Sequence, residues 1–256
     1  MRIGILINCL EIGGAGRMAL HLLDVLDQSD IEVYLFTIDA THEMSIHPDI
    51  YRARKLSTNI FPLSSLDTNA STLFKIFFFP WQYFHFHYHI RKFKLDLIIS
   101  FEDRANIFNM LTIAHVLRII SIRHPMLSVL FFKQPLKRFL IDKFFRFFLQ
   151  RVDMANFNSR ESKDEFQQYF KLDKKKLSVI NNFCDHQILS AEASKDCIPK
   201  EFVDIFHQHP TVIACGRFKP VKGFHRLIRS FRKVNTHFPN FRLVILGEGP
   251  LMPELL

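Results

Sequence analysis

The fold is decided by residues 211–224, which read Thr211-Val212-Ile213-Ala214-Cys215-Gly216-Arg217-Phe218-Lys219-Pro220-Val221-Lys222-Gly223-Phe224. An apolar run of strand length, 211–215, is followed by a loop with glycine at both ends, and then by a segment with the apolar spacing of a helix. The same order occurs near the N-terminus, where the strand-like Ile3–Asn8 leads through Gly13-Gly14-Ala15-Gly16 into a helical segment, Arg17–Asp27. Buried strands that alternate with helices predict a parallel sheet covered on both faces.

The alternation continues between these two points. Strands are predicted at 33–38, 95–100, 119–122, 154–157, 177–180 and 242–246, and helices at 105–117, 136–150, 159–170 and 224–234. From Cys184 to Pro210 the rhythm breaks, and a crossover with one short helix is expected. We therefore predict an α/β protein with a Rossmann-like N-terminal domain at 1–190, an interdomain linker at 191–209 and the first part of a second Rossmann-like domain at 210–256.

The composition limits the classes of function. Lys and Arg number 34 against 25 Asp and Glu, a formal net charge of +9, which predicts an anionic partner. No helix-turn-helix, zinc-finger or RNA-binding signature is present, so we expect no nucleic-acid partner. The 4 cysteines form no C-x-x-C pair, no secretory signal is apparent, and no apolar stretch reaches the roughly 18 residues of a membrane span. We therefore expect a cytoplasmic protein.

The loop 216–223 is the strongest candidate for a ligand site. It places Arg217 and Lys222 beside the start of a helix, directly after a buried strand. A guanidinium, an ammonium and the positive end of a helix dipole converge there, and a diphosphate is the natural ligand for such a group. The loop Gly247-Glu248-Gly249-Pro250 also ends a strand, so the two loops are expected to share one edge of the sheet. An ordinary strand-to-helix turn remains the alternative for the second loop.

The glycine loop at 13–16 permits two interpretations. In the first, its glycines let the backbone approach a phosphate or a substrate at a helix N-terminus. In the second, Gly14-x-Gly16-x-x-Ala19 is a dinucleotide fingerprint with Asp39 as the ribose-binding acid, and the chain is an NAD(P)-binding oxidoreductase. Against the second, Cys9–Gly13 separates the strand from Gly14, whereas the fingerprint needs glycine in an immediate turn.

Five segments resemble, in order along the chain, the motifs of one enzyme family. The loop at 13–16 resembles the acceptor-side loop, and the other four segments are Val152–Ser159 ("ADRVVAVS"), Leu177–Asp185 ("VRVIYNPVD"), Thr211–Gly223 ("VGRLVPEKG") and Leu243–Leu251 ("LVILGEGPL"). The family they resemble is glycosyltransferase family 4, the retaining GT-B enzymes. The resemblance implies a GT-B-like fold and transfer of a sugar, with retention, from a nucleotide diphosphate donor in polysaccharide or lipopolysaccharide biosynthesis.

The resemblance also implies roles for individual residues. Arg217 and Lys222 match the catalytic positions that hold the donor diphosphate and stabilise its departure. The other expected positions are Gly14, Gly16, Gly216, Gly247, Glu248 and Gly249 for the diphosphate and nucleotide, and Gly13 for the acceptor side. A nucleotide-sugar and a glycan or lipid-linked acceptor are the implied partners, and no cofactor or metal is expected.

The chain departs from the family pattern in two places. Glu11 and Ile12 stand where small or polar residues are more usual. The paired glutamates, the nucleobase pocket and the returning C-terminal helix of the family lie beyond Leu256. We therefore expect the chain by itself not to turn over, and a non-catalytic remnant of a glycosyltransferase is a further alternative.

Weaker candidates lie in the first domain. Glu102, Asp103 and Arg104 follow the strand 95–100, and any of them could orient an acceptor hydroxyl or polarise the site, although Asp103 can equally cap the next helix. Arg123, at the end of the following strand, is a comparable acceptor-side candidate.

Two segments of the chain are rich in aromatic residues. His85, His87 and His89 alternate with aromatic residues and would ligate a metal only from one face of a strand; no carboxylate or cysteine cluster lies nearby, so no metal site is predicted. Residues 131–151 mix Lys and Arg with seven Phe, which suggests peripheral contact with an anionic membrane. A helix that covers the sheet, with its basic side chains reaching solvent, is the alternative.

Overall fold

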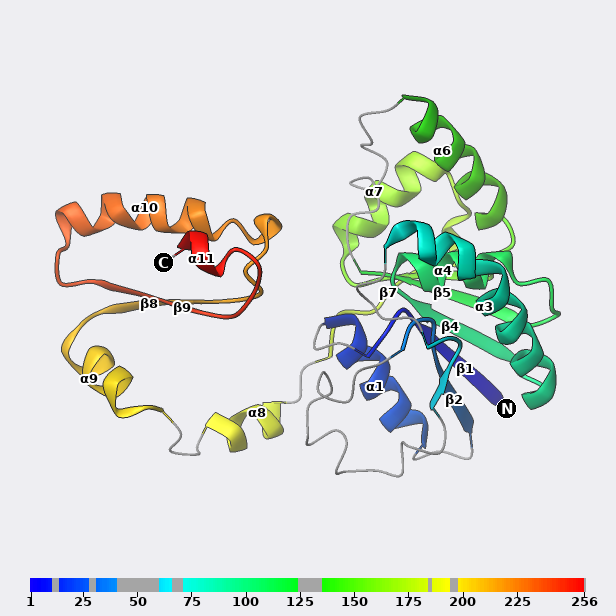
Figure 1. Ribbon diagram of the computed structural model, residues 1–256, viewed down its shortest axis with the longest axis horizontal. Helices are drawn as coiled ribbons and strands as arrows, with labels where there is room; N and C mark the ends of the chain where they lie inside the picture. The colour runs from blue at the N-terminus through cyan, green and yellow to red at the C-terminus, as the bar shows by residue number, and fades with distance from the viewer. Residues whose placement is uncertain are drawn as a thin grey trace. The chain divides into compact units, whose positions relative to one another are not determined.

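The computed structural model describes residues 1–10, 14–27, 31–40, 60–65, 71–123, 135–183, 186–193 and 198–255. The chain divides into two compact units, Met1–Cys184 and Asp185–Leu256, both drawn in Figure 1. The described residues of the predicted crossover form two helices instead of one, α8 (His186–Ala193) and α9 (Lys200–Gln208).

The first unit is a parallel sheet with helices on both faces. Its strands are β1 (Arg2–Ile7), β2 (Glu32–Thr37), β3 (Ile60–Pro62), β4 (Leu97–Phe101), β5 (Leu117–Ile122), β6 (Met154–Phe157) and β7 (Leu177–Val179). Its helices are α1 (Gly14–Asp27), α3 (Thr72–Phe93), α4 (Asp103–Leu111), α6 (Pro135–Leu149) and α7 (Arg160–Phe170). The strands lie in the order β3-β2-β1-β4-β5-β6-β7, and each neighbouring pair is parallel. The α/β prediction with a parallel sheet is confirmed.

Alternating residues of the central strands enter two different cores. Leu6 and Phe36 are paired neighbours in β1 and β2 and are buried with α3 and α4. Ile5 and Leu35, one residue earlier, are buried on the opposite face with α1. Because both faces are covered, each strand reads as a continuous apolar run rather than as an alternating one.

The strand order reverses between β1 and β4. From β1 the chain continues outward to β2 and β3 on one side, and from β4 to β7 on the other. In open α/β sheets ligands bind outside the carboxyl ends of the strands at such a switch point. Asn8, which follows β1, and Glu102, which follows β4, stand at this place in the sheet.

One helix was not predicted from the sequence, and another ends earlier than predicted. The Phe- and His-rich segment forms α3, which contains Pro80 and is capped at its N-terminus by Ser71, whose Oγ accepts the N–H of Phe74. The sequence did not indicate this helix, because its apolar residues occur on all sides and leave no helical period of polar residues. Helix α4 ends at Leu111 and not at Leu117, because Leu117 already pairs with Leu97 in the sheet.

The second unit repeats the strand–loop–helix order. It contains β8 (Thr211–Cys215), the short 3₁₀ turn η4 (Pro220–Lys222), α10 (Phe224–His237), β9 (Arg242–Leu246) and α11 (Met252–Leu255). Strands β8 and β9 pair in parallel, with Cys215 opposite Leu246, so the loops that follow them leave the same edge. The predicted strands at 211–215 and 242–246 are confirmed.

Candidate functional site

The two loops of the second unit lie directly against each other. The backbone N–H of Gly216 donates to the carbonyl of Leu246 at 2.9 Å, and the N–H of Phe218 donates to the carbonyl of Glu248 at 2.7 Å. The N–H of Leu251 returns a bond of 3.1 Å to the carbonyl of Phe218. The two loops that the sequence expected at one edge therefore form one joined surface.

Two glycines make this close approach possible. A Cβ on Gly247 would lie 2.0 Å from the carbonyl oxygen of Gly216, and a Cβ on Gly249 would lie 2.6 Å from that of Phe218. Both glycines also have positive φ, 156° and 152°, which other residues rarely adopt. Gly247 and Gly249 thus have a structural role, the support of the loop that carries Arg217.

Apolar and basic residues alternate along this loop. Phe218 and Phe224 are each 5% exposed, and their rings meet edge to face at 5.3 Å, which fixes the loop to α10. Arg217 and Lys219, on either side of Phe218, are exposed, as is Lys222. Lys219 was not singled out from the sequence, where only its place in a basic loop could have indicated it.

Lys222 and the start of α10 lie beside the end of β8. A Cβ built on Gly216 would be 3.9 Å from the Cδ of Lys222, so the lysine stem folds back over this glycine. Gly223, at φ 68°, turns the chain into α10, whose first N–H groups have no acceptor inside the helix. Lysine, arginine and helix N-terminus therefore concentrate positive charge at the end of one strand.

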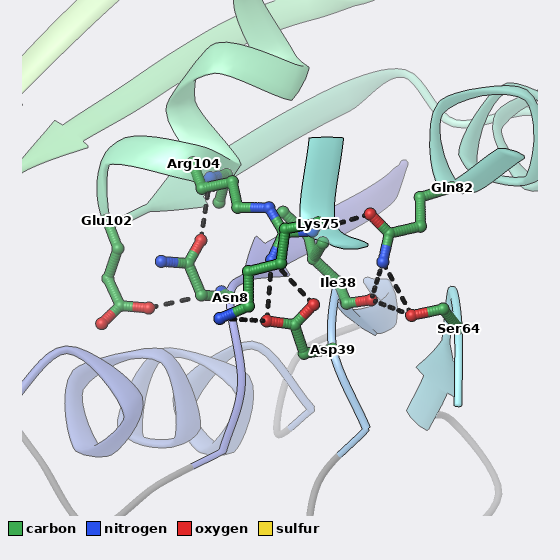
Figure 2. Close-up of polar contacts among 9 residues, drawn as sticks. Asn8, Ile38, Asp39, Ser64, Lys75, Gln82, Glu102 and Arg104 are labelled. Carbon is green, nitrogen blue, oxygen red and sulfur yellow. Dashed lines mark hydrogen bonds and ion pairs between the residues drawn. The ribbon is translucent and has the colours of Figure 1, made fainter. Parts of the chain in front are cut away.

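A second polar cluster lies at the carboxyl ends of β1 and β2 in the first unit (Figure 2). Asp39 is only 3% exposed, and both of its oxygens lie 2.7 Å from Nη1 of Arg104 on α4. Nη2 of Arg104 donates to Oε1 of Gln82 at 2.7 Å, and Nζ of Lys75 lies 3.7 Å from the Asp39 carboxylate. Asp39 is thus held in a buried ion-pair network, which speaks against its expected role as the ribose-binding acid of an NAD(P) site.

Asn8 and Glu102 connect β1 to β4 across the switch point. The N–H of Asn8 donates to Oε2 of Glu102 at 3.3 Å, and Oδ1 of Asn8 accepts the N–H of Ala105 at 3.0 Å (Figure 2). Glu102 has φ 75°, a conformation that is strained for a residue with a side chain and that collects at functional sites. Asn8 was missed as a site residue, because its position beside Glu102 depends on the strand order.

The other candidates of the first unit lie on different helices, Asp103 on α4 and both Gly14 and Gly16 on α1. Asp103 is the first residue of α4, and Glu102 precedes it at the N-cap position, which one alternative had given to Asp103. Gly14 and Gly16 lie in the first turn of α1, where a Cβ on Gly14 would meet nothing within 4 Å. Gly13 lies outside the described residues.

Arg123 is a half-buried cation at the end of β5. Its Nε donates to Oγ of Ser121 at 2.8 Å, and Nη1 donates to Oδ1 of Asn182. Its guanidinium carbon lies 5.3 Å from the centre of the Phe101 ring. Burial lowers the pKa of Arg123, so the surroundings penalise its positive charge. An anionic group at this position would offset that penalty.

The three histidines of α3 do not form a common site. Nε2 of His85 and Nε2 of His89 lie 3.1 Å apart, one helical turn from each other. His87 lies on another side of the helix, where Nδ1 contacts the Tyr83 carbonyl at 3.1 Å and Nε2 accepts the N–H of Ile113. Across the described ranges, no cluster of three His, Cys, Asp or Glu side chains is suited to a metal ion.

Most of the basic, aromatic segment 131–151 is helical. Residues 135–149 form α6, which buries Phe145 and Leu149 in the core and exposes Phe139 and Phe147. Among the helices that the structure describes, none combines the length and the apolar character that a membrane crossing requires.

Comparisons with known proteins place the chain in a family. The model of glycosyltransferase family 4 matches residues 12–188, and that of glycosyl transferases group 1 matches residues 199–255. An uncharacterized glycosyltransferase of Methanocaldococcus jannaschii is 29% identical over 174 residues, which are 65% of this chain and 42% of that protein.

Two further proteins match almost the whole chain. The N-acetylgalactosamine-N,N'-diacetylbacillosaminyl-diphospho-undecaprenol 4-alpha-N-acetylgalactosaminyltransferase of Campylobacter jejuni is 24% identical over 100% of this chain, which spans 65% of that enzyme's length. The HepE protein of Anabaena, solved with UDP and glucose, shares the fold with a TM-score of 0.62 at 16% identity; the match covers 99% of this chain and 62% of that one. The fold is therefore of the GT-B type, and the chain belongs to glycosyltransferase family 4.

Proposed function

We propose that the chain belongs to an enzyme that moves a sugar, with retention at the anomeric carbon, from a nucleotide diphosphate-sugar to a polysaccharide or lipid-linked glycan. The proposal for the donor rests mainly on the joined loops 216–218 and 247–249. They hold Arg217 next to the end of β8, while Lys222 folds back over Gly216. This geometry supports the binding of a diphosphate in the second unit.

The chemistry of the leaving group explains why cations are needed there. When the bond from the sugar to the diphosphate breaks, negative charge develops on the diphosphate oxygens. A guanidinium can donate two parallel hydrogen bonds to such oxygens, and an ammonium adds a compact positive charge. We propose that Arg217 and Lys222 stabilise this charge in the transition state, with the N-terminus of α10 as a third contribution. We expect these groups to replace a metal ion.

For the acceptor we propose the switch point of the first unit. Glu102 lies there in a strained conformation, and its carboxylate accepts a hydrogen bond from the N–H of Asn8. Asp103, the next residue, is the first residue of α4. A carboxylate at this place can orient an acceptor hydroxyl. Arg123, penalised by burial, can meet an anionic group such as the phosphate of a lipid-linked glycan. The acceptor named for the Campylobacter relative, a diphospho-undecaprenol glycan, supports this class. We place the reaction in the cytoplasm, at the inner face of the membrane.

Calorimetric titration of the chain with UDP, GDP, ADP and inorganic pyrophosphate tests the donor site. Since hydrogen bonds to charged groups contribute about 1.5–3 kcal/mol, Arg217→Ala is expected to weaken diphosphate binding by about 10- to 100-fold. Lys222→Ala should weaken it by a similar factor, and EDTA should leave it unchanged. Lys233→Ala, which removes an exposed lysine from the same unit at the other end of α10, is the matched control.

Two results would contradict the proposal. One is diphosphate binding that survives both substitutions. The other is an equal loss in the Lys233→Ala control, which would show that only the net charge matters. A preference for UDP over UMP that disappears with Arg217→Ala would support contact with the distal phosphate.

A further inference from the structure

Helix α3 carries large apolar side chains on two opposite sides. Phe86 and Ile90, at 0% and 3% exposure, face the sheet with Phe36 and Phe108. The opposite side, which we call the outer face of α3, consists of Leu73 (79% exposed), Phe77 (79%), Trp81 (66%), Phe84 (68%) and Tyr88 (56%). Their spacing of three and four residues aligns them in one stripe along the helix. A stripe of this kind marks an interaction surface.

We propose that the outer face of α3 lies flat on an anionic bilayer surface and anchors the first unit there. Trp, Tyr and Phe are the side chains that favour the boundary between headgroups and acyl chains. The helix sequence Thr72–Phe93 contains no Asp or Glu. Arg91 and Lys92 are exposed in its last turn, and Nζ of Lys92 lies 5.7 Å from the centre of the Tyr88 ring. An aromatic stripe that ends in cations is complementary to acidic lipid.

The composition distinguishes a bilayer from a partner helix. A seam between helices is usually filled by Leu, Ile or Val and flanked by charges of both signs. The outer face of α3 has aromatic residues at four of its five positions, and the helix provides no carboxylate to pair with the cations of a second copy. These features favour a lipid surface as the occupant.

The same helix reaches the polar cluster at the switch point. Lys75 and Gln82, on the inner side of α3, contact the buried pair of Asp39 and Arg104 (Figure 2). A first unit anchored through α3 therefore holds the proposed acceptor site close to the membrane. This part of the inference rests on the proposed function, because only a lipid-linked acceptor requires the acceptor site to lie near the membrane. The binding of α3 to the bilayer does not depend on the proposed function.

The chain contains a single tryptophan, Trp81, so its fluorescence reports on the outer face directly. The full chain is mixed with vesicles of phosphatidylcholine alone or with about one third phosphatidylglycerol, without donor or acceptor. We expect co-sedimentation and a blue-shifted emission with the anionic vesicles, and quenching of Trp81 by lipids brominated near the headgroup. Phe77→Glu/Phe84→Glu should weaken vesicle binding by about tenfold or more, while circular dichroism shows the fold retained, because both side chains are exposed.

Val25→Glu is the matched control, because Val25 is 64% exposed on α1, which packs on the opposite face of the sheet. Phe147→Glu tests α6, where the sequence suggested lipid contact. The inference is overturned if vesicles do not bind, if Phe77→Glu/Phe84→Glu binds like the parent, or if Val25→Glu or Phe147→Glu causes the same loss. It is also overturned if the double substitution instead abolishes a dimer seen by sedimentation. Because no nucleotide is present, none of these outcomes affects the proposal for the donor site.

Discussion

Replacement of Arg104 by methionine tests the role of the buried cluster in the first unit. The substitution keeps much of the side-chain volume but removes the guanidinium whose Nη1 contacts both oxygens of the Asp39 carboxylate; the Asp39 side chain is only 4% exposed. Removal of one partner of a buried ion pair costs about 3–5 kcal/mol. Lys75, with Nζ 3.7 Å from Asp39, remains as a second cation, so we expect a value near the lower limit, about 3 kcal/mol.

Hydrogen exchange in β1 provides the assay, because the strand is buried and we expect its amides to open only when the first unit unfolds. A loss of about 3 kcal/mol accelerates their exchange by about 10²-fold. Asp39→Asn should lower the free energy of unfolding by less, since Arg104 keeps its hydrogen bond to Gln82 and is partly exposed to solvent. The double variant should lower it by less than the sum of the two single substitutions. Arg160→Met, an exposed position, should change nothing measurable. Strictly additive effects, or unchanged exchange in Arg104→Met, would refute the reasoning.

Two further predictions concern other parts of the chain. In Gly247→Ala the new Cβ would lie 2.0 Å from the carbonyl oxygen of Gly216, so the joined loops should open and amide exchange at 216–218 should accelerate by about tenfold or more. Gly14→Ala, with open space at its Cβ, is the control and should leave this exchange unchanged. Equal protection of these amides in both variants would show that the contact is not needed. Burial, with smaller contributions from His85 and Lys92, lowers the pKa of His89 to about 4. The unfolded chain takes up this proton at about pH 6.5, so the free energy of unfolding should fall as the pH drops from about 6.5 to 4. In urea titrations, His89→Phe should reduce this dependence of the unfolding free energy on pH. An unchanged dependence would exclude His89 as its cause.

The sheet could be predicted from the sequence because its strands are buried on both faces. Runs such as Ile3–Asn8 and 211–215 therefore carry a continuous apolar signal. The loops at 216–223 and 247–250 could be predicted to meet, since consecutive parallel strands commonly pair and their carboxyl ends share an edge. The packing of Gly247 and Gly249 against the backbone of the other loop could not be predicted, because it depends on atomic distances between the loops.

The first-unit cluster could not be predicted from local patterns. Asp39 and Arg104 are 65 positions apart and meet only because of the order of β1, β2 and β4. Asp39 therefore resembled a ribose-binding acid from its place at the end of a strand. Helix α3 could not be predicted for a different reason. Phe86 is buried and Phe84 is exposed, so the helix has no continuous polar face. Its alternation of Phe and His is also the pattern expected of a strand.

A crystal structure of the chain with a bound nucleotide diphosphate would test most directly whether the β8 loop grips the donor. We predict phosphate oxygens about 2.7–2.9 Å from both the guanidinium of Arg217 and the Nζ of Lys222, at the N-terminus of α10. A diphosphate bound elsewhere, or held at this loop with both side chains turned into solvent, would contradict the account.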